Sequence, residues 1–224
     1  MFTLASHSAR VRSLALSPNG ARAVSGSDDH TIKVWDLRRG TLERTLTGHS
    51  DAIRAVAVLP GGERAVSAAD DHTLRVWSLS TGREEASIDT QLDWIWGLVA
   101  MPRTSLVASI SDDRTIRIWI AEGRVVRVLR GHTAEVSCAT LMPYGESLIS
   151  GGDDRTLRIW TIDGQTTSIL KGHGARITAV AVSGTGRVIS ISADGIASMD
   201  KGSQLAIGGA GLEASGRSEC NFQP

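Results

Sequence analysis

The sequence is short of several features that would point to particular classes of protein. Only two cysteines occur among its 224 residues. No apolar run approaches the roughly 20 residues that a membrane-spanning helix needs. Lysine plus arginine balances aspartate plus glutamate at 24 each, so no net field concentrates nucleic acid or an anionic surface. Met1-Phe2-Thr3-Leu4 opens the chain without the basic segment and apolar core of a signal peptide. We therefore expect a cytoplasmic protein with no membrane partner.

The cysteines also lack the spacing of a metal site. Cys138 falls in a predicted strand, where a small buried thiol is the usual explanation, and Cys220 falls in the C-terminal tail, where we expect a free thiol. The rest of the composition, 41% apolar and 21% charged, is ordinary for a globular chain with one large core. We expect no cofactor and no metal.

The most informative feature is an internal repeat. Four segments nearly coincide: SGSDDHTIKVW (25–35), SAADDHTLRVW (67–77), SISDDRTIRIW (109–119) and SGGDDRTLRIW (150–160). Their tryptophans follow one another at steps of 42, 42 and 41 residues, and in three units 28 residues separate a histidine from the tryptophan. Such a period indicates an architecture in which each unit is one structural module.

Each unit has the pattern of four short strands. In the first unit, residues 11–16 alternate between apolar and polar side chains, and Ser17-Pro18-Asn19-Gly20 supplies a turn. Strands are predicted next over 21–27, 31–36 and 41–46. No segment sustains a helical period, so the predicted fold class is all-β. The alternating pairs Leu14/Leu16 and Val56/Val58 are predicted core residues.

A Gly-His pair near the start of a unit, as in Gly48-His49, and a Trp-Asp-like pair near its end, as in Trp35-Asp36, resemble the WD40 family. The unit of that family is a four-stranded propeller blade. The resemblance implies a WD40 β-propeller domain over 1–207, of five four-stranded blades, with units starting near residues 7, 49, 91, 132 and 173. It also implies that residues 2–4 form an outer strand that completes the last blade.

Two questions about the whole molecule stay open at this level. The family usually has more than five units, so the five here form either a closed small ring or an open arc whose edges need a partner or a second copy. The last unit is degenerate, because it lacks the tryptophan. The tail, 208–224, is rich in glycine and serine and is predicted to be disordered. Its alternatives are the remnant of a sixth unit or a truncated reading frame.

The resemblance assigns a structural role to four positions in each unit. These are the histidine before the first strand, a serine eight residues before the tryptophan, an aspartate six before it, and the tryptophan itself. The residues are His7, Ser27, Asp29 and Trp35; His49, Asp71 and Trp77; Ser111, Asp113 and Trp119; His132, Asp154 and Trp160; and His173, Ser192 and Asp194. A buried indole and a buried carboxylate each cost several kcal/mol when unpaired, so we expect them to satisfy one another in a structural network.

Departures from this pattern predict weaker blades. Ala69 and Gly152 occupy the serine position of the second and fourth units, and Gln91 replaces the histidine of the third. The alternative interpretation of the recurring Asp and His, a catalytic or metal site, is disfavoured because the copies lie in different blades. His30 and His72, which follow the paired aspartates, are predicted to be solvated turn residues.

Partner binding is expected where the repeats differ. The resemblance places recognition side chains on the top face, at the positions three and five residues after each histidine. The predicted partner-binding residues are Trp94, Trp96, Arg10, Arg12, Arg54, Arg176 and Glu135. Tryptophan and arginine are typical of binding hot spots. The alternative is that Trp94 and Trp96 fill the space of the missing histidine and pack between blades. Asp28, Asp70, Asp112 and Asp153 either start turns or form a negative rim on the same face.

The preferred function is a non-catalytic scaffold that binds a protein or peptide through this face, as a sensor or adaptor in a larger signalling assembly. One alternative is a propeller enzyme that uses the central funnel, which the aliphatic pattern of the innermost strands disfavours. The other is phosphate or nucleic-acid binding through Arg10, Arg12, Arg54 and Arg176, which a strong salt dependence would reveal.

Overall fold

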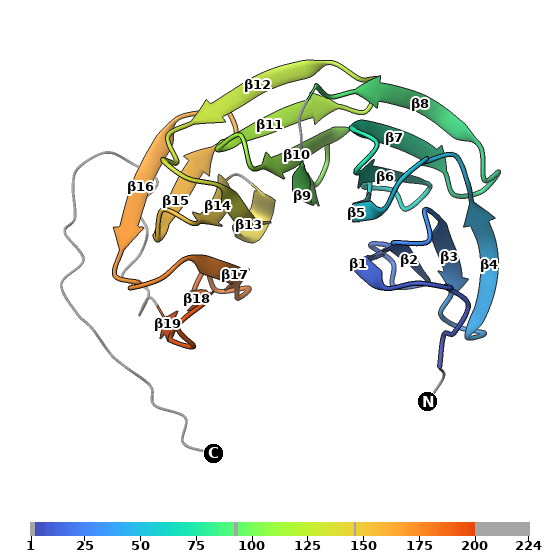
Figure 1. Ribbon diagram of the computed structural model, residues 1–224, viewed down its shortest axis with the longest axis horizontal. Coiled ribbons are helices and arrows are strands. Elements are labelled where there is room, and N and C mark those ends of the chain that lie inside the picture. The colour runs from blue at the N-terminus through green and yellow to red at the C-terminus, as the bar shows by residue number, and fades with distance from the viewer. Residues whose placement is uncertain (1–2, 92–93, 146, 200–224) are drawn as a thin grey trace. The chain divides into compact units, whose positions relative to one another are not determined.

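The protein is described here by a computed structural model, which covers residues 3–91, 94–145 and 147–199. The chain forms five antiparallel sheets, and its only helical element in these ranges is the short 3-10 helix η1 (Pro143–Gly145) (Figure 1). We call the sheets blades 1 to 5 in chain order. The all-β fold class and the five blades are confirmed. In the ranges covered, no helix is long and apolar enough to span a membrane.

The blades have the following strands. Blade 1 comprises β1 (Val11–Leu16), β2 (Arg22–Ser27), β3 (Ile32–Asp36) and β4 (Thr41–Leu46). Blade 2 comprises β5 (Ile53–Val58), β6 (Arg64–Ala69), β7 (Thr73–Ser78) and β8 (Glu84–Asp89). Blade 3 comprises β9 (Ile95–Ala100), β10 (Leu106–Ser111), β11 (Thr115–Ile120) and β12 (Val125–Arg130). Blade 4 comprises β13 (Val136–Leu141), β14 (Ser147–Gly152), β15 (Thr156–Thr161) and β16 (Thr166–Lys171). Blade 5 comprises β17 (Ile177–Val182), β18 (Val188–Ser192) and β19 (Ala197–Met199).

The chain divides into two compact units. The first is Met1–Asp113 with Arg117–Val126, and it holds blades 1 and 2 and most of blade 3. The second is Arg114–Ile116 with Arg127–Pro224, and it holds blades 4 and 5. The prediction of a single repeat domain over 1–207, and the choice between a closed ring and an open arc, stay predictions.

The turn between the second and third strand of each blade explains the repeated Asp-Asp-His/Arg-Thr sequence. In blade 1 the backbone N–H and the hydroxyl of Thr31 both donate to Asp29 Oδ1, at 3.0 and 2.6 Å. The residue between them, His30, has φ of 64°, and its counterparts His72, Arg114 and Arg155 have φ between 62° and 68°. A short polar side chain that bonds its own turn stabilises this left-handed conformation. His30 and His72 are exposed turn residues, as predicted.

The hydrophobic core lies between consecutive blades rather than within one blade. In the first unit, Val24, Ile32 and Val34 of blade 1 join one cluster with Ile53, Val56 and Val58 of blade 2. In the second unit, Ile149, Leu157 and Ile159 of blade 4 pack in the same way against Ile177, Val180 and Val182 of blade 5. Face-to-face packing of sheets buries the side chains that alternate along each strand.

The structure corrects two predictions at the beginning of the chain. Leu14 and Leu16 are 63% and 59% exposed, whereas Val56 and Val58 are 5% and 8% exposed, so only the second pair is core. The reason is that no strand of the first unit packs on that face of β1. Residues 3–6 form no strand, so the predicted outer strand is absent over the part of 2–4 that the structure covers.

The two cysteines differ in what the structure says of them. Cys138 lies in β13 as predicted, and burial raises the pKa of its thiol to about 11, so it is not a reactive thiolate at neutral pH. Cys220 and the predicted disordered tail, 208–224, lie outside the residues that the structure describes.

Candidate functional site

A buried chain of hydrogen bonds runs through blade 1, and it uses a different serine from the predicted one. Trp35 Nε1 donates to Ser25 Oγ at 2.9 Å, and Ser25 Oγ lies 2.7 Å from His7 Nε2. His7 Nδ1 lies 2.8 Å from Asp29 Oδ2. Since the indole only donates, the serine hydrogen is left for His7 Nε2, and the imidazole proton faces the carboxylate from Nδ1. The assignment of Ser27 to this network is therefore wrong.

The register of the strands explains which serine is used. Ser25 pairs with Lys33, and Ala23 pairs with Trp35, between β2 and β3, which brings the indole alongside Ser25. Ser27 lies two residues further along the same face, at the turn, where its hydroxyl accepts the N–H of Asp29 at 3.1 Å. Ser27 thus holds the turn that positions Asp29.

The same network is complete in blades 2 and 4, contrary to the prediction that both are weakened. In blade 2, Ser67 Oγ lies 2.8 Å from Trp77 Nε1 and 2.7 Å from His49 Nε2. In blade 4, Ser150 Oγ lies 2.8 Å from both Trp160 Nε1 and His132 Nε2. Ala69 and Gly152 stand at the position of Ser27, the serine at the turn, and not at the position of Ser25, the serine that bonds the indole. The signal for the correct residue was present in the sequence, because a serine lies ten residues before each of the four repeat tryptophans.

Blades 3 and 5 have incomplete networks. In blade 3, Trp119 still donates to Ser109 at 2.8 Å, but Gln91 stands in place of the histidine, and Ser111 donates to Asp112. In blade 5, His173 Nε2 lies 2.7 Å from Ser190 Oγ, while its Nδ1 is buried without a hydrogen-bond partner.

The carboxylate of blade 5 bonds within its own turn. Asp194 Oδ1 accepts hydrogen bonds from the hydroxyl of Ser192 and from the backbone N–H of Ile196. Ser192 is therefore a turn residue like Ser27. The predicted weakness of blade 5 agrees with this unpaired nitrogen.

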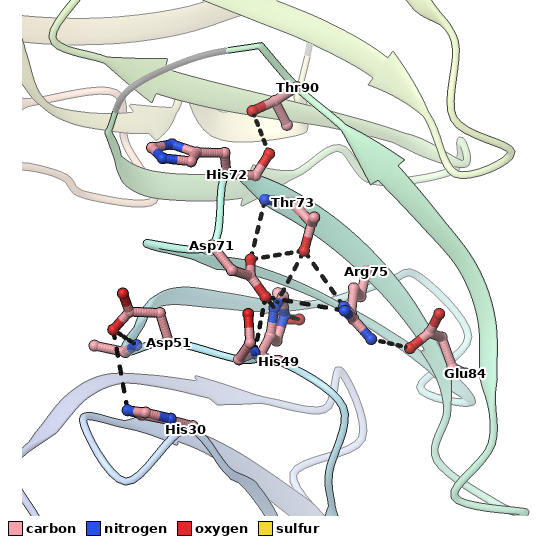
Figure 2. Close-up of polar contacts among 12 residues, drawn as sticks. His30, His49, Asp51, Asp71, His72, Thr73, Arg75, Glu84 and Thr90 are labelled. Carbon is pink, nitrogen blue, oxygen red and sulfur yellow. Dashed lines mark hydrogen bonds and ion pairs between the residues drawn. The ribbon is translucent and has the colours of Figure 1, made fainter.

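Burial fixes the charge states along the network. Burial lowers the pKa of His49 and His132, and the adjacent aspartates oppose this only in part, so both imidazoles are neutral at neutral pH. Burial acts to raise the pKa of Asp71, but hydrogen bonds from Thr73, His49 and Ser50 together outweigh it and hold that pKa below its usual range. Figure 2 shows the chain of contacts continuing outward from Asp71 to Arg75 and Glu84. Arg75 Nη1 lies 2.5 Å from Glu84 Oε2.

The histidines of this network are buried and bonded within their own blades. The side chains of His7, His49 and His132 are 5%, 0% and 1% exposed, so a substrate does not reach them. Over the ranges covered, no group of three or more His, Cys, Asp or Glu residues is placed to hold a metal ion.

The strands that begin each blade all contain a β-bulge at the same position. In blade 1, Val11 pairs with Ser27 and Ser13 with Gly26, so Arg12 is an extra residue without a partner across the ladder. The equivalent extra residues are Arg54, Trp96, Ser137 and Thr178. A bulge interrupts the alternation of side chains and re-aims the extra one. These are the positions five residues after each histidine, which the resemblance marked for recognition.

In the first unit, three of the bulge residues and their neighbours are arginines and tryptophans, and three of these side chains contact one another. Trp94 and Trp96 are 48% and 37% exposed, and their rings meet edge to face with centroids 5.7 Å apart. The guanidinium of Arg54 lies over the Trp96 ring at 5.8 Å from its centroid. We call Arg10, Arg12, Arg54, Trp94 and Trp96 the tryptophan–arginine surface. The exposure of both indoles excludes the interpretation that they only fill space between blades.

Aspartates neutralise two of the arginines. Arg12 Nε donates to Asp28 at 2.7 Å, and Arg54 forms a two-pronged pair with Asp70 at 2.5 to 2.9 Å. The hydrogen bond from Arg12 holds the pKa of Asp28 below its usual range, and the charge of Arg54 acts in the same direction. Asp70 in turn raises the pKa of Arg54. Asp28 and Asp70 therefore bind arginine, and do not form the free negative rim that was one prediction for them.

The remaining predicted recognition residues lie in the second unit. Glu135 and Arg176 are exposed, and their backbone carbonyls accept the N–H of Asp153 and Ala193. Ala193 stands where the other blades have the first aspartate of the turn. The bulge residue Ser137 donates to the carbonyl of Ile177, so it links blades 4 and 5 rather than facing a partner.

The similarity of this chain to known proteins has the same period as the internal repeat. A family model described as "WD domain, G-beta repeat" matches five times, over residues 1–36, 40–78, 82–119, 123–161 and 164–200.

Individual relatives match over single repeats. The nuclear distribution protein nudF of Aspergillus flavus is 49% identical over 45 residues, 20% of this chain and 10% of the relative. A ribosome biogenesis protein BOP1 homolog of Dictyostelium discoideum is 61% identical over 31 residues, which are 14% of this chain and 4% of the relative. The vegetative incompatibility protein HET-E-1 of Podospora anserina is 54% identical over 39 residues, which are 17% of this chain and 3% of the relative. Each match thus spans a tenth or less of the relative.

Proposed function

The chain belongs to the WD40-repeat family, whose model covers nearly all of residues 1–200, and from this premise we propose that it is a non-catalytic scaffold whose tryptophan–arginine surface binds a protein or peptide. WD40 domains generally mediate interactions between proteins. The finer proposal is a sensor or adaptor in a larger signalling assembly in the cytoplasm. The printed names of the three relatives concern nuclear distribution, ribosome biogenesis and vegetative incompatibility, so they support no single pathway.

One observation carries the proposal. Two large indoles are exposed side by side in blade 3, and the arginine of blade 2 lies across one of them. Tryptophan and arginine supply much of the binding energy at protein interfaces. A tryptophan buries a large area at a low cost in conformational freedom. An exposed aromatic pair has no comparable use in the folding of a blade, since the four repeat tryptophans already occupy the buried network.

The ion pairs weigh against the alternative of a phosphate or nucleic-acid site. Arg12 and Arg54 each already have a carboxylate partner, so a phosphate would have to compete with Asp28 or Asp70. The enzyme alternative draws no support from the recurring histidines and aspartates, because they are buried and bonded to one another within each blade. The surface fits a partner that contributes apolar or aromatic side chains against the two indoles and polar groups around them.

The test is affinity capture with three forms of the 224-residue chain. They are the unaltered chain, the double variant Trp94→Ala/Trp96→Ala, and the control Leu42→Ala, which removes an apolar side chain that is 40% exposed on β4. The proposal expects a protein that the unaltered chain and the control retain and the double variant loses. With that protein purified, each tryptophan should contribute about 2 kcal/mol, or roughly 30-fold in Kd.

Two outcomes would contradict the proposal. Equal retention by the double variant would show that recognition lies elsewhere. An affinity that falls by about 10³ or more between low and moderate salt would indicate a phosphate or nucleic-acid site instead.

A further inference from the structure

Three residues of the first unit have the same backbone position but very different side chains. They lie two residues before the bulge of blades 1, 2 and 3, and they are Arg10, Ala52 and Trp94. In each blade the carbonyl of this residue accepts the N–H of the first aspartate of the turn, at 2.9 Å for Arg10 and Ala52 and 3.4 Å for Trp94. The strands β1, β5 and β9 that follow these residues pack side by side in that order. The row therefore has a cation at one end, an indole at the other, and a methyl group between them.

The bulge residues connect the two ends of this row. The hydrogen bond from Arg12 is the main cause of the lowered pKa of Asp28, and the charges of Arg54 and Arg10 act in the same direction, so both of these guanidinium groups lie near that carboxylate. Arg54 also lies over the ring of Trp96, which meets Trp94 edge to face. Arg54 thus links the charged end of the surface to its aromatic end.

Arg10 differs from the other two arginines in its lack of a partner. Arg12 and Arg54 are paired with Asp28 and Asp70 at 2.7 and 2.5 Å. The Arg10 side chain is exposed, and it has no hydrogen bond or ion pair with any residue that the structure describes. A carboxylate from another molecule can therefore pair with Arg10 without displacing a carboxylate of this chain.

The separation of Arg10 and Trp94 limits the length of a segment that reaches both. Packed sheets lie about 10 Å apart, so two successive seams place the backbones of these residues about 20 Å apart. An extended chain spans this distance with about six residues. Because both side chains project from the backbone, a shorter segment also reaches them.

We propose that the tryptophan–arginine surface binds a peptide segment that carries an aspartate or glutamate for Arg10 and a large apolar side chain for Trp94 and Trp96. A guanidinium binds a carboxylate through two parallel N–H donors. A phosphate brings close to two negative charges beside Asp28, whereas a single carboxylate balances the one unpaired guanidinium. The inference rests on the proposed function, because it names the chemistry of the partner for the same surface.

The experiment selects a random library of displayed peptides on the immobilised 224-residue chain. Parallel selections use Arg10→Glu, Trp94→Ala/Trp96→Ala and the control Arg83→Glu. Arg83 is exposed in the turn between β7 and β8, at the opposite end of β7 from Asp70, and its side chain too has no partner in the described part of the chain. The backbone bond from Asp28 to the carbonyl of residue 10 is available to any residue there, and circular dichroism checks the fold of each variant.

The unaltered chain and Arg83→Glu should enrich peptides with an acidic residue within about six positions of a large apolar residue. Arg10→Glu should lose the acidic preference and keep the apolar one, and the double tryptophan variant should lose both. For a selected peptide, Arg10→Gln and the change of its acidic residue to the amide should each weaken Kd about tenfold. The two changes together should weaken it no further than either one, because both remove the same contact.

The outcomes separate this inference from the proposed function. Peptides that depend on the two tryptophans but show no acidic preference would overturn the inference and leave the proposed function standing, as would a selection that enriches no peptide. Peptides that the double tryptophan variant retains equally would contradict both. Tighter binding of a selected peptide after its acidic residue is replaced by phosphoserine would overturn the assignment of Arg10 to a carboxylate.

Discussion

Ser25 Oγ lies 2.9 Å from Trp35 Nε1, and this one hydroxyl joins the indole of β3 to the histidine that precedes β1. The serine accepts from a group that only donates, and it donates to a histidine nitrogen that would otherwise be buried without a partner. The arrangement recurs with Ser67 and Ser150. A buried polar network of this kind stabilises a blade only when every member is satisfied.

Replacing this serine should therefore cost more than replacing its neighbour on the same strand. We expect Ser25→Ala to lower the free energy of unfolding by about 2 to 3 kcal/mol, because it leaves an indole N–H and an imidazole nitrogen unpaired. Ser27→Ala, at an equally buried site, should cost about 1 kcal/mol, because only the N–H of Asp29 loses its partner. Urea denaturation followed by tryptophan fluorescence measures both values. A larger cost for Ser27 would reverse the assignment made here.

Acidification should destabilise the fold in two stages. The pKa values of His49 and His132 are lowered in the folded protein from their ordinary value of 6.5, chiefly by burial, so the unfolded chain binds more protons as the pH falls below 6.5. The neutral imidazoles of His49 and His132 stabilise the folded protein fully above pH 6.5. This stabilisation is lost as the pH falls from 6.5 through the lowered pKa values of the two histidines. A second loss follows below 3.8, where the lowered pKa values of Asp71 and Asp154 act in the same direction.

The measurement for this prediction is the urea midpoint at constant salt from neutral pH down through 3.8, so that both stages are covered. The midpoint should fall below pH 6.5, and His132→Gln should fall less steeply than the unaltered chain over the first stage. A midpoint that rises on acidification would show that the imidazoles are stabilised in their charged form.

Fluorescence quenching should separate the tryptophans into two classes. Trp94 and Trp96 are at least 37% exposed, whereas Trp35, Trp77, Trp119 and Trp160 are at most 4% exposed. We expect acrylamide to quench one fraction of the emission readily, and this fraction should disappear in Trp94→Ala/Trp96→Ala. The unfolding midpoint of this double variant should change little, because surface substitutions cost about 0.5 kcal/mol or less. Retention of an accessible fraction in the double variant would contradict this exposure pattern.

The close approach of blades 1 and 2 predicts an unusual sensitivity at a glycine. An added Cβ at Gly26 would lie 2.5 Å from Ile53 Cγ2, so Gly26→Ala should destabilise the protein by about 1 to 3 kcal/mol through overpacking. Gly184→Ala is the matched control, because nothing lies within 4 Å of a Cβ there. Equal stability of the two glycine variants would contradict the packing described here.

The sequence by itself determined the features that local chemistry controls. The period of 41 to 42 residues, the alternating strands and the Asp-Asp-His/Arg-Thr turns specify five blades, because strand pattern and turn geometry depend only on neighbours in the chain. The same period placed Trp94 and Trp96 at the positions predicted for recognition, and both are exposed.

The tertiary structure decided what depends on register and on contacts between blades. Ser25 and Ser27 are indistinguishable by alternation, since both lie on one face of β2. The recurrence of a serine ten residues before each repeat tryptophan favours Ser25, and the pairing with β3 shows why, because it brings the indole of Trp35 alongside Ser25. Leu14 and Val56 have equivalent places in the repeat, yet one is exposed and the other buried, because burial depends on whether another blade packs there. The pairing of Arg54 with Asp70 likewise requires a bulge that brings together residues 16 positions apart, and no local pattern specifies that geometry.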